Sequence, residues 1–71
     1  MATTMRYEIW VSPGNKLNGH WRFVDKSENK DVAVIRALAR KEECVVVEAW
    51  NAGTNTYHSE VWNKENLKEF V

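Results

Sequence analysis

The chain has 71 residues, enough for one small domain, and its single cysteine, Cys44, excludes both an intrachain disulfide and a metal site built on cysteine pairs. Ten basic side chains balance ten acidic ones, which argues against a duplex-binding domain, because such domains normally carry a basic excess. The composition is 44% hydrophobic and includes four tryptophans, but the longest strongly apolar run, 44–47, is too short to span a membrane.

Two segments near the N-terminus show the pattern of β-strands. Residues 6–11 alternate between two faces and contain β-branched and aromatic side chains, and residues 20–24 form a second short strand. Between them, Ser-Pro-Gly-Asn and Asn-Gly sequences predict a hairpin loop. Residues 1–4 are expected to form a flexible tail, followed by a single domain over 5–71.

An amphipathic helix is predicted over 29–42. Ser27 or Asn29 can cap it, because either side chain can accept a hydrogen bond from a free N–H of the first turn. The expected apolar stripe consists of Val32, Ile35, Leu38 and Ala39. The expected outer face carries Lys30, Arg36, Arg40 and Lys41.

The second half of the chain predicts another hairpin and a short helix. Residues 44–50 contain three consecutive valines, residues 51–56 are turn-rich, and residues 57–62 return as a fourth strand. Residues 64–70 predict a C-terminal helix, with Asn63 as its cap and with Leu67 and Phe70 folding back onto the domain. The order β-β-α-β-β-α predicts an α+β fold: a four-stranded, mainly antiparallel sheet with the main helix on one face. The pattern leaves the strand order open.

Alternation assigns the side chains of each strand to the helix-covered face or to the opposite, open face. We expect the uncharged phase of each strand to face the helix, with Trp21 as the largest core residue. The expected core set is Tyr7, Ile9, Val11, Trp21, Phe23, Val45, Val47, Ala49, Tyr57, Ser59 and Val61. The expected open-face set is Arg6, Glu8, Trp10, His20, Arg22, Val24, Val46, Glu48, Trp50, His58, Glu60 and Trp62. Alternatively, the C-terminal helix folds across the open face and buries its tryptophans.

Three of the four tryptophans fall in the open-face set, among charged side chains. Tryptophan and arginine are enriched at the energetic centres of protein interfaces. We therefore expect a small, non-enzymatic protein-binding module whose partner is another protein or a second copy of the chain, as a homodimer. The expected contact residues are Trp10, Trp50, Trp62, Arg6, Arg22, His20, His58 and Val46. Small neutral domains without motifs are common among phage and mobile-element accessory proteins, many of them stoichiometric inhibitors, and this favours a similar role here.

The alternative is a single-stranded nucleic-acid-binding domain, because aromatic side chains on an open sheet can stack unpaired bases. Glu8, Glu48 and Glu60 disfavour this alternative, since carboxylates on the same face repel phosphates. A second version of it uses the basic outer face of the main helix, formed by Lys30, Arg36, Arg40 and Lys41.

Catalytic and metal-binding sites have weak support in the sequence. Cys44 with His20 or His58 would supply a thiol and a base, but a cysteine that opens a valine-rich strand is typically a small buried hydrophobe. The two histidines and Glu60 carry no further metal-site signature. We expect no catalytic residue, metal or cofactor. The lone cysteine and the lack of an apolar signal segment favour a cytoplasmic protein with no membrane partner.

Overall fold

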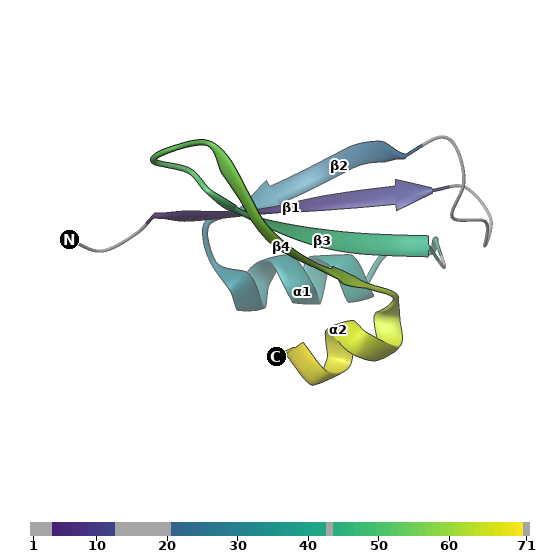
Figure 1. The fold of residues 1–71 in the computed structure, drawn as a ribbon. Helices are drawn as coiled ribbons and strands as arrows, with labels where there is room; N and C mark the ends of the chain where they lie inside the picture. Colours follow the sequence, from purple (N-terminus) through teal and green to yellow (C-terminus); the bar gives the residue numbers. More distant parts are fainter. Residues whose placement is uncertain (1–3, 13–20, 43, 71) are drawn as a thin grey trace.

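The computed structural model describes residues 4–12, 21–42 and 44–70 and confirms the α+β fold, with an antiparallel sheet and two helices. In chain order the elements are β1 (Met5–Ser12), β2 (Arg22–Ser27), α1 (Lys30–Leu38), β3 (Cys44–Asn51), β4 (Thr56–Trp62) and α2 (Lys64–Phe70). The sheet order is β2-β1-β3-β4, so the longest strands, β1 and β3, lie at the centre. Both helices lie on the same side of the sheet (Figure 1).

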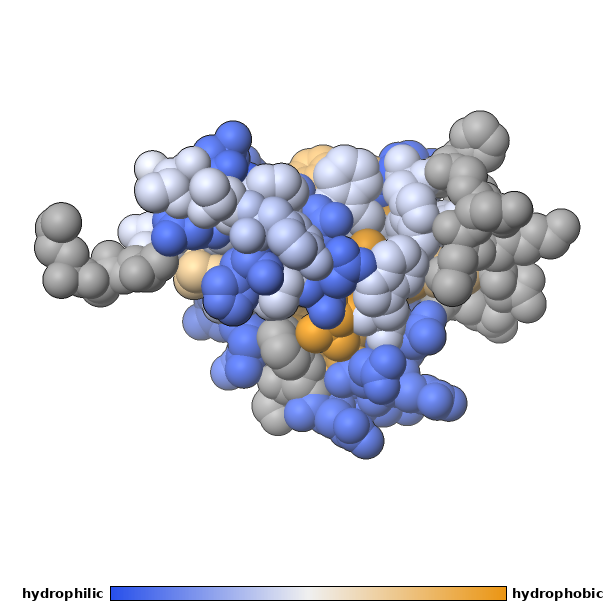
Figure 2. Space-filling view, viewed as in Figure 1, coloured by the Kyte–Doolittle hydropathy of each residue, from blue (hydrophilic) through white to orange (hydrophobic). Residues whose placement is uncertain are grey.

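The core lies between the sheet and the two helices. Its fully buried members are Ile9 and Val11 from β1, Val45 and Val47 from β3, Ala33, Val34 and Ala37 from α1, and Leu67 from α2. Alanines on the buried side of α1 keep that surface flat, which allows the helix to lie close to the pleated strands. In Figure 2, hydrophilic residues cover the outward side of α2, and strongly hydrophobic atoms are visible between α2 and the sheet.

The expected apolar stripe of the main helix was partly wrong. Leu38 packs against the core, but Ile35 is 60% exposed, and the buried side is formed by Ala33, Val34 and Ala37. The helix thus turns Ala33, Val34 and Ala37 toward the sheet, a side next to the predicted stripe that shares its helical spacing.

The ends of α1 show why the helix is shorter than expected. Asn29 is the N-cap, and its side chain accepts a hydrogen bond of 3.1 Å from the Val32 N–H. At the other end, the Arg40 N–H bonds the Ala37 carbonyl, three residues back, at 3.1 Å. This tighter turn ends the α-helix before residue 42 and leads the chain back toward β3.

The C-terminal helix covers the same face of the sheet as α1. Leu67 is completely buried within the core, and the Leu67 N–H bonds the Asn63 carbonyl at 3.1 Å. The side chain of Phe70 lies outside the described part of the chain. The alternative in which this helix folds across the tryptophans is therefore wrong, and both helices leave the opposite face of the sheet uncovered (Figure 1).

The expected phase of the second strand was wrong, as were its bounds of 20–24. Trp21 and Phe23 do not enter the core; Val24 packs there instead, and Phe23 is 44% exposed. Phe23 lies opposite Trp10, so the two share the open face, whereas Arg22 lies opposite the buried Val11. Because Trp21 and Phe23 are large aromatic residues, the sequence favoured a core position for both. In the structure Phe23 packs on Trp10 and Trp21 packs on Trp62, on the face opposite the core.

Two irregularities in the edge strands also break strict alternation. In β2 the register shifts beside Val24, so that Val24 packs on the core while Asp25, opposite Ile9, forms an ion pair with Arg36 of α1. In β4 the register shifts at His58, and Tyr57 then lies opposite Trp50. The expected core position of Tyr57 was therefore wrong. Such bulges add one residue to one strand, and period-two patterns cannot reveal them.

Candidate functional site

The sheet face away from both helices, here called the open face, carries all four tryptophans. Its members are Arg6, Glu8 and Trp10 from β1, Trp21, Phe23 and Lys26 in and before β2, Val46, Glu48 and Trp50 from β3, and Tyr57, Glu60 and Trp62 from β4. All four indoles are partly buried, so they pack on one another and on the sheet while still presenting surface to solvent.

The strand register arranges the centre of this face in three cross-strand rows. Trp10, Val46 and Trp62 form the first row, Glu8, Glu48 and Glu60 the second, and Arg6, Trp50 and Tyr57 the third. The triplets Glu-Ile-Trp at 8–10, Glu-Ala-Trp at 48–50 and Glu-Val-Trp at 60–62 generate this pattern, because β1 and β4 run opposite to β3. This recurrence of Glu-x-Trp was the signal in the sequence that marks the open face directly.

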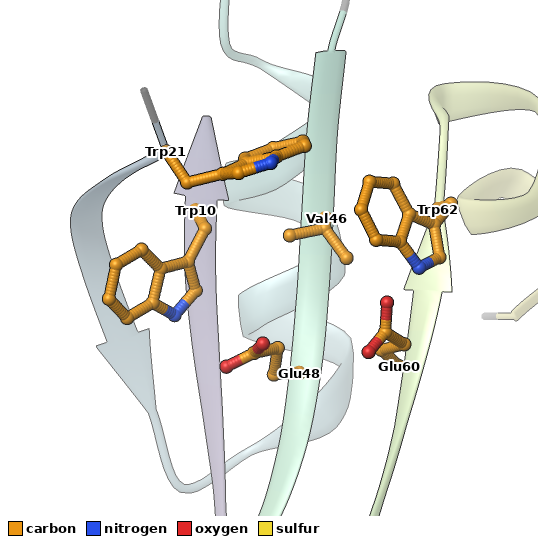
Figure 3. A pocket seen from close by; sticks show the side chains of 6 residues that line it. All are labelled: Trp10, Trp21, Val46, Glu48, Glu60 and Trp62. Atoms are coloured by element: carbon orange, nitrogen blue, oxygen red, sulfur yellow. The ribbon is translucent and has the colours of Figure 1, made fainter. Parts of the chain in front are cut away.

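The first row forms a pocket of about 290 Å³, lined by Trp10, Trp21, Val46, Glu48, Glu60 and Trp62 (Figure 3). Trp21 and Trp62 start from opposite edges of the sheet, yet their rings meet edge to face with centroids 5.0 Å apart. Together they reach across the two central strands and cover Val46, which is only 3% exposed. Val46, expected as a contact residue, is therefore the buried floor of the pocket.

The second row places three carboxylates directly opposite one another, an arrangement that costs stability unless the charges are compensated. Glu8 accepts hydrogen bonds from Arg6 Nε at 2.7 Å and from Trp10 Nε1 at 3.1 Å. Glu48 accepts one from Trp50 Nε1 at 3.1 Å, and Glu60 accepts one from the Tyr57 hydroxyl at 2.7 Å. The bond to Glu60 raises the pKa of Tyr57 to about 12, because a carboxylate acceptor favours the protonated phenol.

The third row holds a cation between an indole and a carboxylate. The guanidinium of Arg6 lies 5.4 Å from the centroid of the Trp50 ring while its Nε bonds Glu8. Arg6 also donates to Asn55 Oδ1 at 3.0 Å, and Tyr57 packs edge to face on Trp50 with centroids 5.8 Å apart. Arg6 is thus on the open face, as expected, and already has partners within the chain.

The structure brings together most, but not all, of the expected contact residues. Arg22 is on the helix side of β2, where its guanidinium approaches Glu42 at 3.5 Å, because strand phase places it opposite Val11. Val24 was also misplaced on the open face. His58 is exposed at the β4 bulge, with Nδ1 3.0 Å from the Ser59 hydroxyl, and His20 lies outside the described residues. Trp21, Phe23 and Tyr57 join the face although alternation assigned them to the core.

Two of the four basic residues expected on the outer side of the main helix pair with acidic side chains of the chain itself. Arg36 pairs with Asp25 at 3.5 Å, and Arg40 donates to both carboxylate oxygens of Glu42, at 3.0 and 2.9 Å. This two-point contact lowers the pKa of Glu42 to about 2 and raises the pKa of Arg40. Lys41 is exposed, whereas Lys30 is half-buried.

The described part of the chain gives little support for a thiol-based or metal-binding site. Cys44 is buried at the start of β3, opposite Ser12. Within residues 4–12, 21–42 and 44–70, no cluster of three histidine, cysteine or acidic side chains has the geometry to hold a metal ion. Neither of the two helices described is long and apolar enough to cross a membrane. Comparison with known protein families, with curated proteins and with solved structures found no significant match.

Proposed function

We propose that this protein is a non-enzymatic binding module of the cytoplasm and that its open face binds another protein. One observation carries the proposal: all four tryptophans lie on the one sheet face that neither helix covers. Indole rings remove large apolar areas from water when a partner covers them, and they dominate interface energies. The protein acts stoichiometrically on its partner, as many phage and mobile-element accessory proteins do.

The rings on this face are held in place before any partner binds. Trp10 and Trp50 donate to Glu8 and Glu48, and each ring also packs edge to face on an aromatic neighbour. Side chains that are already ordered lose little entropy on binding, so more of the contact energy contributes to affinity. The charged groups among the rings add register and selectivity to the affinity that the rings provide.

The same face is poorly suited to nucleic acid. Its middle row consists of three glutamates, whose charges oppose a phosphate backbone. Arg36 of α1 and Arg40, which follows that helix, are both engaged by carboxylates of the chain itself. A single-stranded oligonucleotide at low salt should therefore leave tryptophan fluorescence unchanged; a salt-sensitive shift would instead support the nucleic-acid alternative.

Capture experiments with matched variants test the proposal. The immobilised protein and the variants Trp10→Ala, Trp62→Ala and Ile35→Ala are incubated with extract of the source cells. Ile35 is the control, because it is 60% exposed on α1, on the opposite side of the sheet. We expect a protein retained by wild type and by Ile35→Ala but lost from both tryptophan variants. Equal retention by all four would contradict the proposal, and light scattering shows whether the captured partner is a second copy.

A further inference from the structure

The pocket of the open face combines aromatic walls with negative charge. Three of its six lining residues are tryptophans and two are glutamates, and none of the six is cationic. The faces of indole rings attract cations, and an adjacent carboxylate adds an ion pair to that attraction. In Figure 3 the carboxylates of Glu48 and Glu60 lie beside the rings, on the same side of the sheet.

The open face already binds one cation in this way, supplied by the chain itself. Arg6 lies 5.4 Å from the Trp50 centroid and donates to Glu8 at 2.7 Å. The pocket repeats these chemical elements on the other side of the glutamate row, where Trp10 and Trp62 flank Val46. At the pocket the chain supplies the rings and the carboxylates. None of the described residues that line the pocket is cationic.

Charge balance along the glutamate row points the same way. Glu8 has Arg6 as an ion-pair partner, and Lys26 lies opposite it on β2. Within the described residues, the ion pairs found do not include Glu48 or Glu60, whose hydrogen bonds come from the neutral groups of Trp50 and Tyr57. A cation placed between the carboxylates of Glu48 and Glu60 would balance their negative charge, as Arg6 does for Glu8.

The size of the pocket limits what it can accept. About 290 Å³ is at the lower end of the range for small-molecule sites and corresponds to one long side chain rather than to a cofactor. The apolar floor at Val46 suits the methylene stem of such a side chain, while its charged head meets the carboxylates.

We propose that the pocket lined by Trp10, Trp21, Trp62, Glu48 and Glu60 receives a lysine or arginine side chain of the protein partner. The inference rests on the proposed function of the open face and specifies the chemistry of what binds there. The partner segment carries a cationic residue at the centre of its contact, flanked by residues that cover the tryptophan rings.

Peptide titrations followed by NMR of the indole N–H groups test the inference on the full chain. One probe is a nine-residue Gly/Ser peptide with a single central lysine. The control peptide has norleucine in place of that lysine, which keeps the aliphatic chain and lacks the charged ammonium group. We expect the lysine peptide, but not the norleucine peptide, to shift the indole signals of Trp10 and Trp62. Raising the salt concentration should weaken the effect.

Charge variants of the pocket provide the second arm. Glu48→Gln and Glu60→Gln each keep a hydrogen-bond acceptor and remove the charge, so each should raise the Kd of the lysine peptide by roughly twofold to fivefold, the range for an exposed ion pair. Glu69→Gln, an identical change at an exposed position of α2, should leave the Kd unchanged.

Three results would overturn the inference: equal shifts with both peptides, no shift with either at millimolar concentration, or an unchanged Kd in both charge variants. Equal shifts would mean that the pocket takes an apolar side chain, which leaves the open face as a protein-binding surface. The capture experiment with Trp10→Ala and Trp62→Ala reports on that surface independently of the peptides, so the two failures can be told apart.

Discussion

Glu42 belongs to a small network that connects three segments of the chain. Two nitrogens of Arg40 donate to the Glu42 carboxylate at 3.0 and 2.9 Å, and Arg22 of β2 approaches it at 3.5 Å. The Arg40 carbonyl in turn accepts a hydrogen bond from Lys64 at the start of α2. This small network therefore joins the end of α1 to an edge strand and to the C-terminal helix.

Acid titration should show the contribution of Glu42. Its pKa is about 2 in the folded protein against 4.5 for the unperturbed group, so the unfolded chain binds more protons and stability falls as the pH drops through this window. Measured by urea unfolding between pH 5 and pH 2, the free energy of unfolding should decline less steeply in Glu42→Gln than in wild type. Equal slopes would contradict this interpretation.

Trp21 provides a second test at the level of one residue. It packs edge to face on Trp62 at the surface, whereas Ile9 is completely buried between the sheet and α1. Trp21→Ala should therefore destabilise the fold by about 1–2 kcal/mol, and Ile9→Ala by about 3–4 kcal/mol, the usual cost of emptying a core position. A larger loss for Trp21→Ala than for Ile9→Ala in chemical denaturation would place Trp21 in the core after all.

At the scale of the elements, the sequence was sufficient for type and order. The valine-rich β3, the amphipathic α1 and the turn-rich segments between strands follow from local patterns, and the bounds of β1, β3, β4 and α2 were predicted to within one residue at either end. Asn29 was one of two expected caps and is the one that caps α1. Local hydrogen bonding and hydrophobic period determine these features, so a single sequence reveals them.

The cap at Asn29 gives the prediction that belongs to this scale. Its side chain satisfies the Val32 N–H at 3.1 Å, and Asn29→Ala leaves that donor without its partner. The variant should lose about 1 kcal/mol of stability in thermal or chemical unfolding. Asn29→Asp, which keeps the accepting oxygen, should remain close to wild type, and a loss as large as that of Asn29→Ala would argue against capping as the cause.

The phase of the edge strands was beyond local patterns. Trp21, just before β2, and Phe23 within it together offer more apolar area than Val24, so hydrophobicity favoured the wrong face. What decides the phase is pairing at a distance: Phe23 lies opposite Trp10, and the ring of Trp21 reaches Trp62 on the far edge. In β4 the bulge at His58 shifts Tyr57 onto the open face, and nothing in the residues around it announces that extra residue.

At the scale of the whole molecule, the two helices lie on one face of the sheet and the four tryptophans lie on the other. Both helices pack on one face and bury the aliphatic core, and the indoles gather on the other, over Val46 and the glutamate row (Figures 1 and 3). The three Glu-x-Trp triplets could have identified this face from sequence, although the contribution of Trp21 could not. In the chain alone, this layer of rings on one side of an open sheet is partly exposed.

The most direct test of this account is the affinity of the captured partner for matched variants, measured by titration calorimetry. We predict that Trp62→Ala, on the open face, weakens binding at least tenfold, which is about 1.4 kcal/mol, while Ile35→Ala, on the outer side of α1, binds as wild type does. Circular dichroism of both variants establishes that they remain folded. Unchanged affinity in a folded Trp62→Ala variant, or a loss confined to Ile35→Ala, would contradict the open face as the binding surface.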